Sequence, residues 1–289
     1  MDKPKLSVAL AVYNEEENIS QCLESVKGLA DEIVVVDGSS TDRTIEIAKS
    51  FGAKITVTGN PAIFHINKQM AFDLAGGDWI LSLDADERVT KKLGEEILKV
   101  IRMSDEEIEE YQKTLKKKRL FLRHQQLLEK RDGKIGTSAG GYAAFFFPRL
   151  NFFLGKFLKF GGVYPDGVIR LFKKDKAHLP SKDVHEQMTV DGRVGWLEND
   201  LIHIDSKTFG RYLQRNSRYI DLLAADLRKQ HLEINLTSSV DYFLIKPLLW
   251  FLTTSLRNKG ILDGYQGLVF SFFSALRFPR AYWRYINNK

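Results

Sequence analysis

The chain has 289 residues, a net charge of +6 and 44% hydrophobic residues, which is ordinary for a folded α/β protein with added segments. Its single cysteine, Cys22, excludes an intramolecular disulfide and fits a reducing compartment. The first residues form no basic and apolar leader, and the uncharged apolar runs near the C-terminus are shorter than the ~18–20 residues that span a bilayer. We therefore expect a cytoplasmic protein without a transmembrane helix.

Strand and helix patterns alternate along residues 1–102. Strands are expected at 6–12, 32–36, 54–57 and 79–83, and helices at 18–29, 42–51, 67–75 and 91–102. This alternation predicts a mostly parallel sheet with helices on both faces. A dinucleotide-binding Rossmann domain would have Gly-x-Gly-x-x-Gly after its first strand, and this chain has no such loop.

Polar residues follow three of these strands directly. Tyr13 and Glu15 follow the first strand, Asp37 ends the second, and Asp84-Ala-Asp86 follows the fourth. Ligands of open α/β sheets bind at the carboxyl edge, and hard divalent cations prefer carboxylate oxygens. The Asp-x-Asp segment therefore suggests a diphosphate bridged by a metal ion, with an acidic turn as the alternative.

Residues 104–131 form a separate, highly charged segment. Ser104 and Glu107 have the spacing of a capping box, and the acids that follow give way to bases, which complements a helix dipole. We predict one long, largely exposed helix that ends near Gly133. It could cover the site or pair with another subunit in a homo-oligomer, and a solvated helix is the default interpretation.

The last third of the chain reads as helical and basic. Strands are expected at 142–147 and 167–172, a helix at 207–233, and further helices from Lys246-Pro247 onward. Residues 241–289 hold seven Lys or Arg, among them Arg277, Arg280 and Arg284, against two acids, together with twelve aromatic residues. This composition predicts amphipathic helices on an anionic membrane surface, or else a helical subdomain with a basic outer face. No nucleic-acid-binding module is present, so no nucleic-acid partner is expected.

Several motifs resemble those of a known family. The segments 12–15, 36–42, Lys68-x-x-Ala71 and Asp84-Ala-Asp86 resemble family 2 glycosyltransferases of the GT-A fold in order and spacing. The segments 151–155, 161–166, 170–172, 184–186 and Lys246-Pro247 resemble a narrower subgroup, the bacterial lipopolysaccharide-core β-1,4-glucosyltransferases.

The resemblance implies a fold, a reaction and a place in the cell. It implies a GT-A catalytic domain over residues 1–206, with a nucleotide-binding half at 1–102, the insertion at 104–131 and an acceptor half at 142–206. Residues 207–289 would form a C-terminal amphipathic helical region. The implied enzyme moves a hexose, with glucose the expected one, from a UDP-sugar to a lipopolysaccharide-core or other cell-envelope glycan. A lipid-linked acceptor would place it at the inner face of the cytoplasmic membrane.

The resemblance also assigns roles to individual residues. It implies that Asp86 ligates Mn²⁺ or Mg²⁺, while Asp84 lies nearer the ribose or a metal-bound water. The remaining cofactor-binding roles fall on four residues, with Tyr13 at the base-holding end, Glu15 on the ribose, Asp37 on the uracil N3–H and Lys68 on phosphate. For Lys68, a solvated helix lysine is the alternative. His203 is the other metal candidate, since imidazole can complete a Mn²⁺ shell, and a buried core histidine is the alternative.

Glu186 is the candidate catalytic base. It follows His185 in the segment that corresponds to an acidic motif of the family, and a base there would take the proton of the acceptor hydroxyl. An ion pair with Arg170 or Lys182 is the alternative role. If Glu186 is the base, a single displacement inverts the anomeric centre, so an α-linked donor gives a β-linked product.

Two other functions remain open. A sugar nucleotidyltransferase would need a basic, glycine-rich loop after the first strand, where this chain has an acidic loop without glycine. A non-catalytic, membrane-associated scaffold with the same fold is the other alternative. Tyr164, Asp166 and Trp196 are acceptor-side candidates, and for Trp196 core packing is equally consistent with the sequence.

Overall fold

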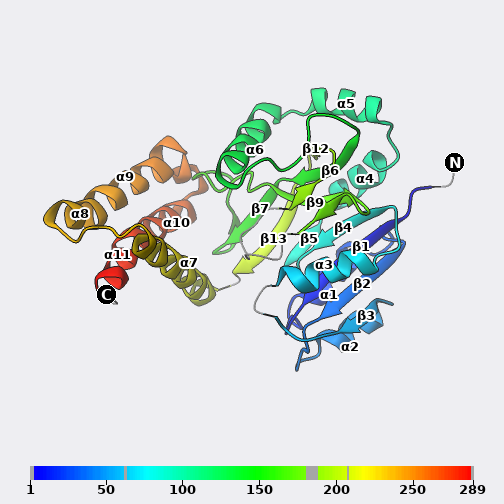
Figure 1. The fold of residues 1–289 in the computed structure, drawn as a ribbon, viewed down its shortest axis with the longest axis horizontal. Helices are drawn as coiled ribbons and strands as arrows, with labels where there is room; N and C mark the ends of the chain where they lie inside the picture. The colour runs from blue at the N-terminus through cyan, green and yellow to red at the C-terminus, as the bar shows by residue number, and fades with distance from the viewer. Residues whose placement is uncertain (1–2, 62–63, 180–187, 207, 288–289) are drawn as a thin grey trace. The chain divides into compact units, whose positions relative to one another are not determined.

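The structure is a computed structural model that describes residues 3–61, 64–179, 188–206 and 208–287 (Figure 1). A seven-stranded sheet with the order β12-β6-β9-β4-β1-β2-β3 forms its centre. The pairs β1–β2, β1–β4, β2–β3 and β12–β6 are parallel, and β9 is antiparallel to both β4 and β6. The strands are β1 (Leu6–Val12), β2 (Glu32–Asp37), β3 (Lys54–Val57), β4 (Trp79–Leu83), β6 (Tyr142–Phe147), β9 (Val168–Lys173) and β12 (Arg193–Trp196).

Helices cover both faces of this sheet, and its central strands are largely apolar. All seven residues of β1 are buried, as expected for a strand between two layers of helices. Leu10 packs in one core cluster with Leu23 and Ile97, while Ala9 packs with Phe72 in a second cluster, because successive side chains point to opposite faces. The covering helices are α1 (Ile19–Ser25), α2 (Thr44–Ser50), α3 (His65–Leu74) and α4 (Lys91–Val100).

Short strands extend the fold beyond the large sheet. The strand β5 (Glu87–Val89) pairs antiparallel with β13 (Leu201–Ser206), so that His203 lies opposite Glu87. The strands β7 (Arg149–Phe153) and β8 (Lys156–Phe157) form an antiparallel pair, as do β10 (Ala177–His178) and β11 (Thr189–Val190). Because β5 directly follows the Asp84-Ala-Asp86 segment, its pairing with β13 brings His203 close to that segment.

The insertion forms two helices, which corrects the prediction of one long, exposed helix. The helix α5 (Asp105–Thr114) ends where Leu115 adopts φ −56° and ψ 120°, and α6 (Lys118–Asp132) follows. The predicted capping box of Ser104 and Glu107 and the end of the helix at Gly133 are both confirmed. The helix α6 is not a solvated helix, because Phe121 is fully buried and stacks on Trp196 with ring centroids 4.6 Å apart.

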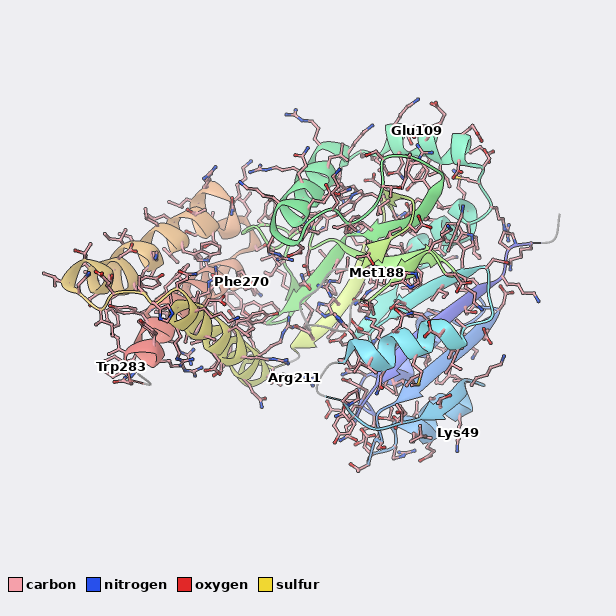
Figure 2. All side chains as sticks on the ribbon, in the orientation of Figure 1. Lys49, Glu109, Met188, Arg211, Phe270 and Trp283 are labelled. Carbon is pink, nitrogen blue, oxygen red and sulfur yellow. The ribbon has the colours of Figure 1, made fainter. Side chains whose placement is uncertain are left out.

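The residues that the structure describes after β13 are mostly helical. Phe270 packs edge-on against Phe153, with ring centroids 5.8 Å apart, and can be found in Figure 2. The elements are α7 (Phe209–Lys229), α8 (Leu236–Val240), the π-helical turn η1 (Asp241–Ile245), α9 (Lys246–Leu252), the π-helical turn η2 (Thr253–Arg257), the 3₁₀ turn η3 (Gly260–Asp263), α10 (Tyr265–Ala275) and α11 (Arg277–Asn287).

The chain divides into two compact units. The first comprises Met1–Arg149 and Pro165–His203, and the second comprises Leu150–Tyr164 and Ile204–Lys289. The domain boundary predicted between residues 206 and 207 stays a prediction. Within the part of the chain that the structure describes, every helix is too short or too polar to cross a bilayer.

Candidate active site

The carboxyl ends of β1, β2 and β4 bring three polar segments to one edge of the large sheet. Val12, the last residue of β1, lies opposite Asp37, and Leu10 lies opposite Leu83 at the end of β4. The loops that start at Tyr13, Gly38 and Asp84 therefore leave the sheet side by side. This is the edge where open α/β sheets bind their ligands.

Asp37 organises the first of these loops. Its carboxylate is fully buried and accepts hydrogen bonds from the Ser40 backbone N–H at 2.7 Å and from the Ser40 hydroxyl at 2.6 Å. The same Ser40 oxygen accepts from the backbone N–H of Asn14 at 2.8 Å, which ties the β1 loop to the β2 loop. Asn14 and Ser39 have φ values of 53° and 66°, and such left-handed non-glycine residues cluster at functional sites.

The β1 loop presents an aromatic ring and a carboxylate. Tyr13 is 42% exposed at the strand end, so its ring is open to a planar ligand. Glu15 accepts a hydrogen bond from the Asn18 side-chain amide at 2.8 Å, and its backbone N–H donates to the Thr44 hydroxyl at 2.7 Å. The backbone of the loop is thereby fixed on both neighbouring helices.

Asp84 is held between two buried cations. One oxygen lies 2.7 Å from the Lys68 ammonium, and the other accepts from the Arg170 guanidinium. Burial alone would raise the pKa of Asp84, but Arg170 and Lys68 outweigh that effect and hold the pKa well below its usual range. Burial and the nearby Arg170 charge lower the pKa of Lys68. Asp84 is therefore an ionised carboxylate whose charge is already balanced by the protein.

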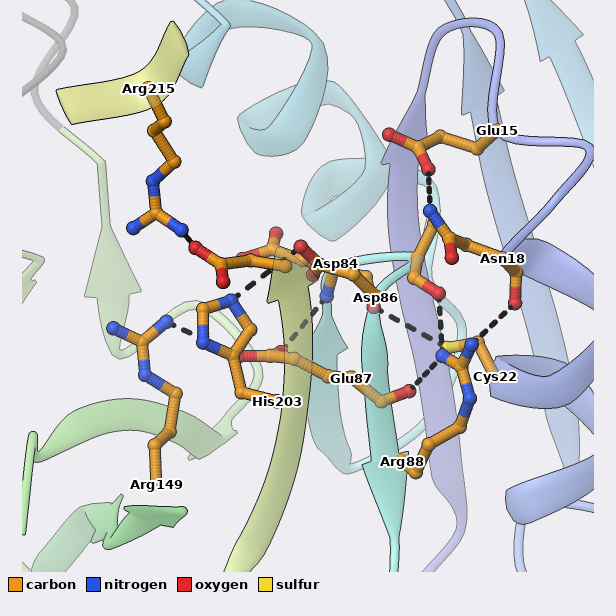
Figure 3. Close-up of polar contacts among 12 residues, drawn as sticks. Glu15, Asn18, Cys22, Asp84, Asp86, Glu87, Arg88, Arg149, His203 and Arg215 are labelled. Carbon is orange, nitrogen blue, oxygen red and sulfur yellow. Dashed lines mark hydrogen bonds and ion pairs between the residues drawn. The ribbon is translucent and has the colours of Figure 1, made fainter. Parts of the chain in front are cut away.

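Glu87 extends this charge network and fixes the backbone of the motif. Its side chain is fully buried, pairs with Arg170 at 2.7 Å and Arg149 at 3.5 Å, and accepts the backbone N–H of Asp84 at 3.0 Å. Arg149 also pairs with Asp166 at 2.9 Å. Three cations from different elements, Lys68, Arg149 and Arg170, thus contact the acidic segment. Figure 3 shows one of them, Arg149, near Glu87.

Asp86 has different surroundings from Asp84. Its Oδ2 lies 3.5 Å from His203 Nε2, while its Oδ1 is buried and has no hydrogen-bond partner among the described residues (Figure 3). Burial alone would raise the pKa of Asp86, but the interaction with His203 outweighs it and lowers the pKa. A buried carboxylate oxygen without a partner is unusual and needs a reason.

The donor atoms of this pair fit a divalent cation. A carboxylate oxygen and an imidazole nitrogen suit Mn²⁺, and the partnerless Oδ1 of Asp86 is available as a ligand. Asp84 differs from Asp86, because Lys68 at one oxygen and Arg170 at the other already balance its charge. Within the described part of the chain no group of three Asp, Glu, His or Cys side chains is assembled for a metal.

The comparison with known families gives this arrangement a context. The chain matches the family model "Glycosyl transferase family 2" over residues 7–174, which is more than half of its length. The chain belongs to glycosyl transferase family 2. The predicted family and the predicted GT-A type of fold, a mostly parallel α/β sheet followed by helices, are thus confirmed.

Individual relatives of this family 2 member are similar over different extents. An uncharacterized glycosyltransferase of Rickettsia bellii is 43% identical over 94 residues, which cover 32% of this chain and 31% of the relative. The chain spans about a third of the length of the Rickettsia relatives that it matches. The lipopolysaccharide core biosynthesis glycosyltransferase LpsC of Rhizobium meliloti is 25% identical over 293 residues, covering 95% of this chain and 92% of LpsC.

A solved structure is similar over a smaller part of the chain. Glucosyl-3-phosphoglycerate synthase from Mycobacterium tuberculosis, in complex with Mn²⁺ and UDP-glucose, is 25% identical. The similarity covers 29% of this chain and 34% of that chain, with a TM-score of 0.27.

The family 2 structure brings most of the predicted site residues to one sheet edge, and it settles two alternatives. Trp196 is a core residue, since it is 1% exposed and stacks between Phe121 and Phe146. Lys68 is buried on Asp84 and is not a solvated helix lysine. Glu186 lies outside the described residues. The ligand roles of the others stay predictions, namely those of Tyr13, Glu15, Asp37, Lys68, Asp84, Asp86 and His203.

The sequence analysis did not predict the ion pairs of Arg149 with Glu87 and Asp166. It considered Glu186 as a partner of Arg170, whereas Arg170 pairs with Asp84 and Glu87. Both arginines occur in apolar strand segments, Phe147-Pro-Arg149-Leu and Val168-Ile-Arg170-Leu-Phe. A charge in a strand that is otherwise buried needs a counter-charge, so the acidic Asp84–Glu87 segment was a detectable partner for both.

Proposed function

We propose that this family 2 member is an inverting, metal-dependent glycosyltransferase. It moves a hexose, with glucose the expected one, from a UDP-sugar to a lipopolysaccharide-core or other cell-envelope glycan. The observation that carries the proposal is Asp86 in the turn between β4 and β5, with one buried oxygen that has no hydrogen-bond partner among the described residues and the other beside His203. The full-length similarity to a lipopolysaccharide core glycosyltransferase supports the choice of acceptor class.

Asp86 and His203 would hold the Mn²⁺ or Mg²⁺ ion. When bound, the ion supplies Lewis-acid stabilisation of the charge on the leaving diphosphate. His203 is 8% exposed in its side chain and sits in register with Glu87, so strand pairing fixes the distance between the imidazole and the acidic segment. Ligands held on paired strands are more precise than ligands on loops.

The nucleoside would lie over the loops of β1 and β2. A carboxylate has about four lone-pair positions, so Asp37 can accept the uracil N3–H in addition to its two hydrogen bonds from Ser40. Because Asp37 is fully buried, the base would reach it only after the loop over it moves aside. The exposed ring of Tyr13 would stack on the base, and Glu15 would accept a ribose hydroxyl. Lys68 would meet a phosphate oxygen from its place 2.7 Å from Asp84.

Glu186 is our candidate for the base that takes the acceptor proton. In this role it acts once, in a direct displacement at the anomeric carbon, so the configuration inverts. General bases typically contribute ~10²–10⁴-fold to the rate. The variant Glu186→Gln should therefore keep its donor affinity and lose turnover by a factor in that range.

The metal role of Asp86 has a direct test that needs no acceptor. Titration calorimetry of UDP in the presence and absence of Mn²⁺ should show that Mn²⁺ strengthens binding to the wild type. In Asp86→Asn this strengthening should vanish, while the exposed matched control Asp73→Asn on α3 should keep it. An Asp86→Asn protein with unchanged Mn²⁺-dependent affinity would remove the metal site from the proposal.

The reaction class has a separate test. Incubation with labelled UDP-glucose and a lipopolysaccharide-core acceptor should transfer the label to the acceptor. In a parallel incubation with UTP and glucose 1-phosphate, release of pyrophosphate with formation of UDP-glucose would instead identify a nucleotidyltransferase. UDP binding without any turnover of donors and acceptors would favour the non-catalytic scaffold.

A further inference from the structure

A long helical segment of the second compact unit carries an apolar face that its own unit does not cover. From α8 to η2 every fourth residue is apolar and between 38% and 81% exposed, namely Leu236, Val240, Leu244, Leu248, Leu252 and Leu256. Phe243, Ile245 and Leu249 are exposed beside them. We call these nine residues the leucine face. Soluble proteins rarely expose so many adjacent apolar side chains unless something binds there.

The two π-helical turns help to keep this row of residues on one side of the helical segment. In an α-helix a step of four residues overshoots one turn by about 40°, so such a row slowly winds around the axis. The two π-helical turns, Asp241–Ile245 and Thr253–Arg257, have wider turns and reduce this drift. Insertions of this kind inside helices occur frequently at functional sites.

The opposite side of the same helical segment is already packed. Tyr242 stacks on Tyr282 with ring centroids 5.0 Å apart, and the Trp250 indole N–H donates to the Ser274 hydroxyl at 3.1 Å. Thr254 and Ser255 are buried. The segment therefore has its core contacts, and the leucine face is a second surface that the described residues leave exposed.

The charges around the leucine face favour an anionic lipid surface. Arg257 and Lys259 are exposed at its end. The two acids among residues 236–287 are both engaged, because Asp241 pairs with Lys246 at 2.9 Å and Asp263 accepts backbone N–H groups at 2.8 and 3.0 Å. A symmetric dimer would use the same patch on both copies, and residues 236–259 offer the two basic residues only Asp241, which is already paired with Lys246.

We propose that the leucine face inserts into the interface of an anionic bilayer, with Arg257 and Lys259 among the headgroups. The biological role of this insertion rests on the proposed function. A lipid-linked acceptor lies in the membrane, so the enzyme would have to bind there to reach it. Helices with one apolar face lie in the plane of the interface, which agrees with the absence of a described helix able to cross a bilayer. Insertion of leucines is driven by burial of apolar area, so binding persists in salt that screens charges.

The same structure revises the basic cluster expected from the sequence. Arg277 packs on Trp250, with its guanidinium carbon 4.2 Å from the ring centroid, and burial lowers its pKa. Arg284 pairs with Asp221 at 2.5 Å and donates to the Ser217 hydroxyl at 2.7 Å. These two arginines hold helices together, so reversing their charge would test folding more than lipid binding.

Vesicle flotation of the whole chain tests the proposal. The wild type should float with vesicles of phosphatidylcholine and phosphatidylglycerol, and most of it should still float in 1 M salt, where the Debye length is about 3 Å. The variant Leu244→Gln/Leu248→Gln/Leu252→Gln should lower the bound fraction about tenfold or more. The matched control Leu74→Gln/Leu122→Gln/Leu127→Gln changes three exposed leucines of the first unit and should float like the wild type.

The outcomes separate this proposal from the proposed function, because flotation needs no sugar nucleotide. Loss of flotation in the test variant, with UDP affinity kept, supports membrane insertion. Equal flotation of the wild type and the folded test variant overturns it. The proposal is also overturned if the wild type does not bind vesicles and sediments as a dimer that the same substitutions dissociate. The leucine face would then be a contact between two copies of the chain.

A probe on the leucine face gives an independent readout. Cys22 is fully buried, so a thiol introduced by Leu248→Cys can be labelled selectively with an environment-sensitive fluorophore. Its emission should shift to the blue on addition of vesicles and be quenched by lipids with nitroxides on their acyl chains. The control Leu127→Cys on α6 should show neither effect. A label at position 248 that stays in water while the protein floats would overturn insertion of this face.

Discussion

Arg170 shows how much a single buried charge decides at the edge of the sheet. Its guanidinium pairs with both Asp84 and Glu87, and the side chain is 8% exposed. Removal of one partner from such a network leaves uncompensated buried charges, which costs more than the network itself contributes. Arg170 is therefore the residue whose loss should disturb both the stability and the shape of the acidic segment.

We predict that Arg170→Met lowers the free energy of unfolding by about 3 kcal/mol, since the buried Glu87 and the partly buried Asp84 both lose a buried cation. The matched control is Arg43→Met, which removes an arginine from an exposed pair with Glu46 and should leave the unfolding free energy nearly unchanged. Urea denaturation of the three proteins measures the difference. Equal effects of the two substitutions would contradict the network described for Arg170.

Glu32 should control the acid stability of the sheet at the end remote from the site. Burial alone would raise the pKa of Glu32, but hydrogen bonds from Lys54, Ser7 and the Gly76 backbone N–H outweigh it and lower the pKa from 4.5 to about 2. A lowered pKa in the folded state stabilises the fold above pH 4.5, and this contribution disappears as the pH falls toward 2.

We predict that Glu32→Gln destabilises the protein at pH 7 and flattens its loss of stability between pH 4.5 and 2. Removal of a carboxylate with several charge-assisted hydrogen bonds should cost about 1.5–3 kcal/mol. Denaturation at a series of pH values measures both effects. Glu24→Gln, at an exposed position of α1, serves as the control and should keep the pH dependence of the wild type. If Glu32→Gln lost stability as steeply as the wild type between pH 4.5 and 2, the role of Glu32 would be refuted.

The residues of the site could be located from the sequence, while the pairing of each carboxylate with a particular cation could not. Apolar runs that stop at Asp37 and at Asp84 are local patterns, so the sheet edge and its polar residues were predictable. The different surroundings of Asp84 and Asp86 depend on Lys68, Arg170 and His203, which other segments contribute. Such pairings follow from strand order and register, which local patterns do not encode.

The insertion shows the same limit at the scale of an element. Its capping box and its glycine end are local signals, and both were predicted correctly. The break after α5 has a tertiary cause, because the backbone N–H of Lys116 donates to Glu198 at 2.8 Å in place of a helical carbonyl. Leu115, a good helix former, is drawn into the core at the break and is 8% exposed.

We predict that Phe121→Ala lowers the free energy of unfolding by about 3–5 kcal/mol, because it empties the space between α6 and the Trp196 ring. The control Leu127→Ala, at a 59% exposed position of the same helix, should change it by at most about 0.5 kcal/mol. Chemical denaturation compares them. A small effect of Phe121→Ala would mean that α6 is not part of the core.

At the scale of the whole molecule, the two compact units have separate cores. The first holds the two large clusters around the seven-stranded sheet. The second has two small buried clusters, one of Leu227, Tyr242, Tyr282 and Tyr285 and one of Ile220, Ala224 and Ala281. A unit that buries little apolar surface is only marginally stable on its own.

We therefore predict two thermal transitions, with the second unit unfolding at the lower temperature. Tyr282→Ala removes a ring that contacts Tyr242 and should lower the first transition while leaving the other in place. Scanning calorimetry of the wild type and the variant measures this. A single transition that the substitution moves as a whole would show that the two units unfold as one.

The aromatic stack at Trp196 gives the protein an optical signal of its own. The indole lies between two phenylalanine rings with centroids 4.6 Å away, and its N–H donates to Gln125 of α6 at 3.0 Å. Its fluorescence should therefore be blue-shifted and respond when α6 separates from the sheet, whereas Trp283, 60% exposed on α11, should emit as in water (Figure 2). Variants that keep one tryptophan each would let the insertion and the C-terminal helices be followed separately, in real time and without an added dye.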